Sequence, residues 1–199
     1  MTRVAVLDFG MGNLRSVAKA LEKVGANVSV TPQVPDDVDA LVVPGQGAFG
    51  SCLANLGPQK DAVEAWIRSG RSFLGICLGL QILFESSQEG GGRGLGVFEG
   101  KVVRFPDGVK IPHIGWNEVT PTREVALFDG IDPGARFYFC HSFYPDATPA
   151  DAAATSDYGV AFACAVARDN VVAVQFHPEK SGEHGLALLG NFLRGVRAA

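Results

Sequence analysis

The sequence predicts an α/β protein: an open, mostly parallel sheet with helices on both faces and an antiparallel extension. Short apolar runs alternate with amphipathic segments over the first half of the 199 residues. Such alternation is typical of parallel strands joined by crossover helices. The second half holds further strand-like runs separated by turn residues, which favours antiparallel pairing there. No linker or repeat divides the chain, so a single domain over 1–199 is expected.

In the first half, the predicted strands are short runs rich in branched apolar residues, at 4–9, 27–31, 39–45 and 72–77. A first helix is expected between Asn13, a candidate N-cap, and Gly25, a candidate stop, because apolar residues recur there on one face. Two further helices are predicted at 60–70 and at 78–87. Strand and helix therefore alternate up to residue 87.

In the second half, strands are predicted at 95–105, 136–145, 160–169 and 170–178, the last two forming a hairpin. A final amphipathic helix is expected at about 183–197. The glycine-rich run 88–96 has the composition of a flexible segment, and 145–159 (PDATPADAAATSDYG) that of a surface loop.

Composition excludes several classes of function. Hydrophobic residues make up 47% and charged residues 19% of the chain, and its net charge is −4, which gives no reason to expect nucleic acid or an anionic membrane as a partner. No apolar run approaches the roughly 20 residues that span a bilayer, and the N-terminus passes directly into a strand pattern, which favours a cytoplasmic location. The four cysteines contain no CxxC pair, so we expect neither a metal site nor a disulfide, and at most one reactive thiol (Cys52, Cys77, Cys140, Cys164).

The stretch GICLGLQ places Cys77 where a strand pattern changes to a helical one. Glycines two residues before and after it, Gly75 and Gly79, would relieve crowding at a sharp turn, as around the nucleophile of a strand–turn–helix elbow. The thiol would then lie at a helix N-terminus, whose dipole favours thiolate, and the Leu78 N–H could bind an oxyanion. The alternative is a core cysteine in a glycine-softened strand.

A thiolate nucleophile needs a base, usually a histidine oriented by a third group. Of the four histidines, His177 ends an apolar strand and would face the crevice at the carboxyl edge of the sheet. Glu179 could accept its second ring N–H and fix the tautomer. A strand-end histidine beside a solvated glutamate explains the same pattern.

The segment PGQGAFG (44–50) follows another predicted strand. A Pro-Gly-x-Gly turn can present backbone N–H groups to an oxyanion or a carboxylate, although it lacks the Lys-Ser/Thr of a phosphate-binding P-loop. A plain turn is the alternative.

Together these motifs resemble the class I, triad-type glutamine amidotransferases, whose fold is flavodoxin-like. The resemblance spans Val4 to Phe192. It rests on DFGMGNLRSV (8–17), PGQGAFG (44–50), GICLGLQILFESSQEG (75–90), HIGWN (113–117) and FHPEKSG (176–182).

The resemblance implies glutamine hydrolysis without a cofactor. Cys77 would attack the side-chain amide to give a γ-glutamyl thioester, His177 would transfer protons, and Glu179 would orient His177. Backbone N–H groups of Leu78 and Gln46 would hold the oxyanion, the latter through a peptide that reorients as a switch. The glutamine pocket would be lined by Gly45, Gly47, Gln81, Glu89, Ser142 and Phe143.

The motifs are closest to the branch of the family that passes ammonia to a (β/α)8-barrel cyclase in histidine biosynthesis, the two chains forming a heterodimer. That cyclase makes imidazole glycerol phosphate and an aminoimidazole carboxamide ribonucleotide. Asn13, Trp116 and Lys180 match positions expected near that interface. The family's loop often reads PGVG, so Gln46 is a departure that bears on the strength of gating. The alternatives are a glutaminase serving pyridoxal phosphate synthesis, a partner-free cysteine hydrolase, and a binding module with vestigial catalytic residues.

Overall fold

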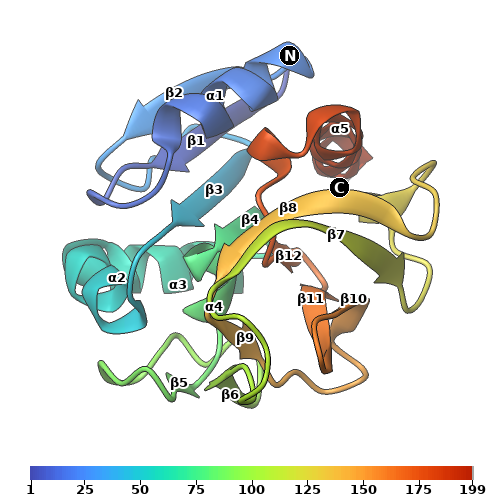
Figure 1. Cartoon of the computed structure of the whole chain (residues 1–199). Coiled ribbons are helices and arrows are strands. Elements are labelled where there is room, and N and C mark those ends of the chain that lie inside the picture. Colours follow the sequence, from blue (N-terminus) through green and yellow to red (C-terminus); the bar gives the residue numbers. More distant parts are fainter. Residues whose placement is uncertain (199) are drawn as a thin grey trace.

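A computed structural model, which describes residues 1–198, places nine strands in one sheet (Figure 1). The strand order is β2-β1-β3-β4-β12-β11-β10-β7-β8. The first five strands are parallel: β1 (Arg3–Leu7), β2 (Asn27–Thr31), β3 (Ala40–Gly45), β4 (Ser72–Cys77) and β12 (Val171–Val174). The antiparallel strands are β11 (Ala161–Arg168), β10 (Ala152–Asp157), β7 (His113–Pro121) and β8 (Ala135–His141). The predicted α/β class and its antiparallel extension are confirmed.

Helices cover both faces of the parallel part, as predicted (Figure 1). Helices α1 (Leu14–Lys23) and α5 (Gly182–Ala198) share one core cluster with Val4 and Val6 of β1. Helices α2 (Phe49–Leu56) and α3 (Lys60–Arg68) share the other with Ala5 and Leu7. Neighbouring strand residues point to opposite faces, so an unbroken apolar run such as β1 supplies both cores.

Several predicted elements have the expected bounds. Strands β2 and β4 coincide with 27–31 and 72–77, and β11 and β12 form the predicted hairpin. Helix α1 starts after Asn13 and ends just before Gly25, whose φ of +97° is a conformation that favours glycine. Asn13 occupies the N-cap position, but its side chain makes no capping hydrogen bond to the described part of the helix.

The predicted helix at 78–87 is wrong in length. Helix α4 covers only Leu78–Gln81 and is soon followed by the short strand β5 (Ser86–Ser87). The carbonyls of Ile82 and Leu83 accept hydrogen bonds from the backbone N–H groups of Leu95 and Val97 instead of from a further helical turn. The end of the glycine-rich run and Val97 therefore fold back onto the segment directly after the helix.

Two strands predicted in the second half are shorter or divided. The run 95–105 yields only β6 (Lys101–Arg104), because Gly96 and Gly100 have φ of +63° and +104°, outside the strand region. The run 136–145 divides at Ser142 into β8 and β9 (Phe143–Pro145). Strand β9 joins a second sheet, of order β5-β6-β9.

The prediction of a surface loop over 145–159 is wrong, because this segment contains β10, which lies between β11 and β7 in the large sheet. Its residues Ala152–Ala154 are buried. Small alanines give little strand pattern, and the flanking Pro, Asp and Gly mark turns, so the run looks like a loop. Helix α2 and strand β7 were also not expected from the sequence.

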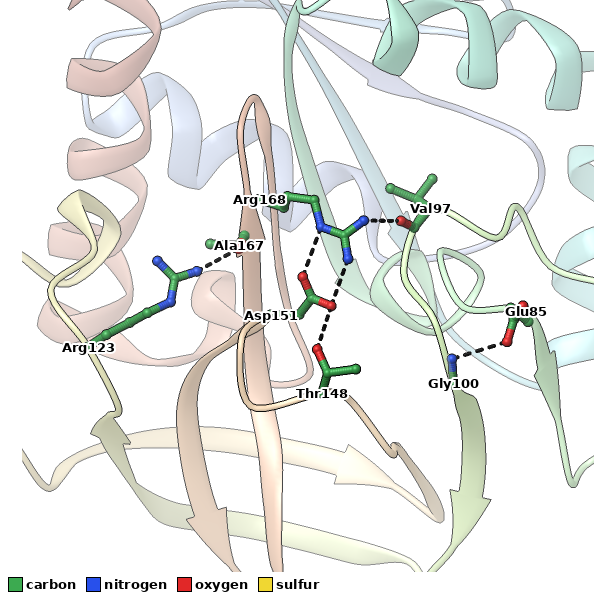
Figure 2. Close-up of polar contacts among 8 residues, drawn as sticks. All are labelled: Glu85, Val97, Gly100, Arg123, Thr148, Asp151, Ala167 and Arg168. Carbon is green, nitrogen blue, oxygen red and sulfur yellow. Dashed lines mark hydrogen bonds and ion pairs between the residues drawn. The ribbon is translucent and has the colours of Figure 1, made fainter.

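An ion pair between the buried Asp151 and the exposed Arg168 holds the turn before β10 (Figure 2). Asp151, whose side chain is 6% exposed, lies 2.7 Å from Arg168 and accepts a hydrogen bond from Thr148. Arg168 also donates to the carbonyl of Val97. The pair therefore joins the 148–151 turn, the end of β11 and the segment that closes the glycine-rich run.

Candidate active site

Cys77 ends β4 in a strained backbone conformation, with φ of +57° and ψ of −108°. A Cβ on Gly79 would lie 1.8 Å from the carbonyl oxygen of Val43, and one on Gly75 would lie 2.5 Å from the carbonyl oxygen of Gly79. Both glycines are therefore required by the close approach of three backbone segments. This is the crowded turn that the Gly-x-Cys-x-Gly spacing predicts.

The helix behind the thiol is shorter than expected. Because α4 spans only Leu78–Gln81, it has few aligned peptide dipoles at its N-terminus. A helix this short therefore stabilises a thiolate at Cys77 much less than the longer predicted helix would. Charge on Cys77 must be stabilised by neighbouring side chains instead.

His177 follows the carboxyl end of β12, beside β4, as predicted. Its Nδ1 lies 2.9 Å from Oε1 of Glu179, and the Cys77 thiol is close enough to interact with the imidazole. Burial lowers the pKa of His177, but the hydrogen bonds to Cys77 and Glu179 outweigh it and raise the pKa to about 10. The ring therefore holds its proton at neutral pH and can donate it to a leaving group.

A cavity of about 220 Å³ opens beside the thiol. Most residues that were expected to bind or polarise glutamine line this cavity. They are Gln46, Gly47, Cys77, Leu78, Gln81, Glu89, Ser142 and Phe143. Gly45 lies just behind the wall, since a Cβ there would meet the Leu78 side chain at 2.7 Å.

The amide of Gln81 is oriented by two acceptors. Its Nε2 donates to the carbonyl of Phe143 (2.9 Å) and to Oε1 of Gln175 (3.0 Å). Its Oε1 is buried and has no hydrogen-bond partner among the described residues. An unpaired buried acceptor is costly, so its position on the cavity wall indicates a place for a ligand N–H.

Glu89 closes the cavity from the glycine-rich run. Its Oε2 accepts a hydrogen bond of 2.6 Å from the N–H of Phe49, which starts α2 directly after the PGQG turn. Gly50 and Gly91 approach so closely that a Cβ on Gly91 would lie 2.1 Å from the Gly50 Cα. The glycine-rich run is therefore tightly packed here against the segment that follows the PGQG turn.

Two of the three expected interface residues gather at one aromatic ring. The ring of Trp116, which is 53% exposed, lies 6.2 Å from that of Tyr138, and the Lys180 Nζ lies 5.7 Å from the same ring. Lys180 belongs to the short helix η3 (Pro178–Lys180), against which α1 packs. Asn13 stands at the start of α1, in the N-cap position.

Sequence reasoning missed four residues at the site. Pro112, Cys140 and His141 line the cavity, and Gln175 contacts Cys77 from behind. Gln175 could have been noticed as the polar residue that interrupts an apolar run two positions before His177. Pro112 directly precedes β7, Cys140 and His141 lie on β8, and only the antiparallel pairing of these strands brings them to the thiol.

Of the remaining cysteines, Cys140 lines the same cavity as Cys77, whereas Cys52 and Cys164 are not among the described residues that line it. Cys52 and Cys164 are buried, and burial raises the pKa of both thiols, that of Cys52 to about 12. All four cysteines are free. Within residues 1–198, no group of acidic, histidine or cysteine side chains is arranged to hold a metal ion, and no helix has the length and apolarity to cross a bilayer.

A larger cavity, of about 680 Å³, lies at the opposite edge of the sheet, where β4 and β12 begin. Its walls include Ser72, Asn170 and Phe192. Cys77, His177 and Glu179 are not among the described residues that line it. Size alone therefore does not identify the site, and the smaller cavity beside Cys77 is the chemically equipped one.

Comparisons with known proteins agree with this geometry. The family model for class-I glutamine amidotransferases matches residues 5–196. Imidazole glycerol phosphate synthase subunit HisH of Methanothermobacter thermautotrophicus is 46% identical to the chain, over 98% of this chain and 100% of the relative. The HisH subunit of Methylococcus capsulatus is 50% identical, over 98% of this chain and 97% of the relative.

Solved structures show the same fold at lower identity. PurLQS from Thermotoga maritima superposes with a TM-score of 0.79 at 20% identity, and a glutamine amidotransferase crystal structure with a TM-score of 0.74 at 22% identity. In each case 98% of this chain and 98% of the other chain are covered. On these matches, the chain belongs to the class-I glutamine amidotransferase family and, within it, to the HisH subunits of imidazole glycerol phosphate synthase.

Proposed function

We propose that this chain hydrolyses glutamine to glutamate and ammonia and supplies the ammonia to a cyclase subunit in histidine biosynthesis. The observation that carries the proposal is the interaction of His177 with both Cys77 and Glu179, beside the cavity that Gln81 lines. That arrangement is a nucleophile, a proton carrier and an orienting carboxylate in reach of one small ligand. The HisH names of the relatives favour this function over a role in pyridoxal phosphate synthesis.

The chemistry follows from the raised pKa of His177. With the ring protonated beside the sulfur, Cys77 can attack the amide carbon as thiolate, forming a C–S bond and an oxyanion. The backbone N–H groups of Leu78 and Gln46 are the proposed donors to that oxyanion. Collapse breaks the C–N bond while His177 gives its proton to the departing ammonia, which leaves a γ-glutamyl thioester. The neutral ring then takes a proton from water, and the hydroxide formed in that transfer releases glutamate.

Recognition of the amino-acid head of glutamine is assigned to side chains and backbone groups that line the cavity. The unpaired Oε1 of Gln81 would accept an N–H of the glutamine α-ammonium, and Glu89 would supply a negative charge nearby. Backbone groups at Ser142 and Phe143 would contact the amino-acid head. Oε2 of Glu89 already accepts from the Phe49 N–H, and its other oxygen would serve the ammonium, so Glu89 would connect the substrate to the segment after the PGQG turn.

The partner is proposed to be a (β/α)8-barrel cyclase that docks on the face bearing Asn13, Trp116 and Lys180. Strand β7 exposes the large apolar side chains of Ile114 (58%) and Trp116 (53%). Neighbouring exposed apolar side chains of this size often mark a protein–protein interface. We also propose a cytoplasmic location, in keeping with four free cysteines.

The test is glutamate release by the purified chain alone, with the matching cyclase, and with the cyclase plus its nucleotide ligand. We expect weak hydrolysis by the chain alone and a rise of about 10²-fold or more in the last condition, since one missing oxyanion donor costs about that much. Cys77→Ala should abolish release in all three conditions and leave cyclase binding intact. Equal, fast hydrolysis in every condition would contradict the partner proposal, and release by Cys77→Ala would contradict the nucleophile.

A further inference from the structure

Gln175 is a fully buried amide at the end of an apolar strand. It follows β12 directly, and its exposed fraction is 0%. Burying a primary amide costs free energy unless its hydrogen bonds are made inside the protein. Both ends of this amide are used, and both partners belong to the site described above.

The strand register brings Gln175 to the nucleophile. Strands β12 and β4 are parallel with Val174 opposite Ile76, so the next residues along, Gln175 and Cys77, lie abreast. The Gln175 Nε2 lies 3.7 Å from the Cys77 Sγ, a hydrogen-bond length that the large sulfur atom allows. Gln175 and His177 are two positions apart, and successive side chains alternate in extended backbone, so both reach the sulfur from the same strand end.

The backbone on both sides of the amide is held. The N–H of Gln175 donates to the carbonyl of Cys164 (2.8 Å), and that of His177 donates to the carbonyl of Tyr138 (2.8 Å). The side chain therefore starts from a fixed point between two neighbouring strands. Its direction is a property of the fold rather than of a mobile surface segment.

The orientation of the amide follows from one carbonyl group. The Phe143 carbonyl can only accept, so the group of Gln81 that faces it at 2.9 Å is the NH₂. The same NH₂ lies 3.0 Å from the end of Gln175, which must then be the oxygen. The opposite end of Gln175, facing Cys77, is consequently its NH₂, and a donor points at the sulfur.

We infer that Gln175 is a positioning residue for glutamine hydrolysis, which binds the Cys77 sulfur through its N–H and the Gln81 amide through its carbonyl. The inference rests on the proposed function for the roles of Cys77 and Gln81. An N–H that points at sulfur stabilises the thiolate more than the thiol, a task that the one-turn α4 performs weakly. The carbonyl holds the Gln81 amide at the cavity wall, with the Gln81 Oε1 left without a partner among the described residues. One side chain thus sets the separation between the nucleophile and the substrate-binding acceptor.

Two substitutions separate the two contacts. Gln175→Glu keeps an oxygen for Gln81 but replaces the donor to Cys77 by a negative charge, whereas Gln175→Met removes both contacts at similar volume. Gln33→Glu, at an exposed glutamine, is the matched control. Circular dichroism and thermal unfolding establish that each full-length variant is folded before it is compared.

The first readout is alkylation of Cys77 by iodoacetamide as a function of pH, followed by peptide mass because the exposed Cys140 can react as well. A hydrogen bond to a charged group corresponds to about 10- to 100-fold in an equilibrium. The midpoint of the Cys77 profile should therefore rise by about one pH unit or more in both variants and stay in place in the control. Unchanged profiles in folded Gln175→Glu and Gln175→Met would overturn the inference.

The second readout is the division between kcat and KM for glutamine in the complex with the cyclase. We expect kcat to fall about 10-fold or more in both variants, and KM to rise clearly only in Gln175→Met, where Gln81 loses its acceptor. Equal KM values in the two variants would remove the link to Gln81. The alkylation result does not depend on glutamine. If the pH profile of Cys77 alkylation shifts but the protein shows no glutaminase activity, the proposed function is contradicted and the contact between Gln175 and Cys77 is still supported.

Discussion

At the scale of single residues, the site is controlled by hydrogen bonds between groups that are buried together. His177 is 4% exposed, and burial alone would make its ring neutral. The bonds to Cys77 and Glu179 reverse that effect, and the pKa rises to about 10. The ring is thus kept as a proton donor by two neighbours rather than by solvent. Glu179 therefore has an electrostatic role as well as an orienting one.

Substituting Glu179 by Gln should lower the pKa of His177 and weaken the hold on its tautomer, with little change in volume. Glutamate release in the cyclase complex should fall by about 10²–10⁴-fold, the range usual for disabling general acid–base catalysis. Steady-state kinetics at neutral pH measure this. Glu183→Gln, at an exposed glutamate in the first turn of α5, is the control and should keep full activity. A loss far below that range in Glu179→Gln would show that the carboxylate is dispensable.

At the scale of elements, the turn from β4 to α4 exists because three backbones meet with no room for a side chain. Gly79 lies against the carbonyl of Val43 in the neighbouring strand β3. The parallel register places Gly45 of β3 beside Cys77 of β4, so the PGQG turn and the thiol are held at the same level. The two motifs are far apart along the chain, and the pairing of β3 with β4 makes them one local structure.

Gly79→Ala tests this packing, because its Cβ would lie 1.8 Å from a backbone oxygen that cannot move alone. We expect the free energy of unfolding to fall by about 3 kcal/mol or more, as for overpacking at a rigid site. Gly190→Ala is the matched control inside α5, where the nearest atom to the new Cβ is 3.8 Å away. That change should be neutral or stabilise by up to about 1 kcal/mol, because alanine favours helix more than glycine does. Urea unfolding of both variants gives the answer, and equal effects would contradict the crowded turn.

At the scale of the whole molecule, a row of hydrogen-bonded polar side chains in the antiparallel half of the sheet leads to the cavity. The carbonyl of Phe143 accepts from His141 Nδ1 at 2.8 Å, and His141 Nε2 lies 3.3 Å from His113 Nδ1. Asn117 contacts the far nitrogen of His113 at 3.3 Å. Burial lowers the pKa of His113 to about 4 and that of His141 to about 3, so both rings are neutral at pH 7. The folded protein therefore contains two histidines that stay neutral between about pH 6.5 and 4, a range in which the same histidines of the unfolded chain bind protons.

This arrangement makes the protein sensitive to acid. Below about pH 6.5 the unfolded chain binds protons at these histidines and the native state does not, so stability falls as the pH drops from 6.5 toward 4, by about 1.4 kcal/mol per pH unit for each ring. His177 acts in the opposite sense: its contribution is complete below pH 6.5 and is lost as the pH rises through about 10. In the acid range its contribution is constant, so the loss there is assigned to the two neutral rings.

His141→Gln keeps a donor and an acceptor but cannot titrate, so its free energy of unfolding should depend less steeply on pH between about 6.5 and 4.5 than that of the wild type. Urea unfolding at several pH values measures the slope. His184→Gln, at an exposed histidine, is the control and should retain the wild-type slope. Parallel slopes for His141→Gln and the wild type would show that the buried ring contributes nothing to acid sensitivity.

Local patterns in the amino-acid sequence were sufficient to predict the parallel strands, helices α1 and α3, and the candidate catalytic residues. Runs such as 27–31 and 72–77 have the composition of strands, glycines flank Cys77, and His177 with Glu179 follows a strand. Each of these features lies within a few residues of the chain, where spacing and residue type display it directly. The single-domain organisation and the role of each site residue stay predictions.

The remaining features depend on contacts between segments that are distant in the chain. Strand β10 is made of small residues without alternation, and the pairing partners on either side turn it into sheet. Helix α4 ends at Gln81, and directly beyond it the carbonyls of Ile82 and Leu83 pair with Leu95 and Val97 rather than with a further helical turn. Gln175 and His141 reach the site through strand register, which joins residues that are far apart in the sequence. Hydrogen bonds between distant segments leave no local pattern, because their partners are chosen by the packing of the whole chain.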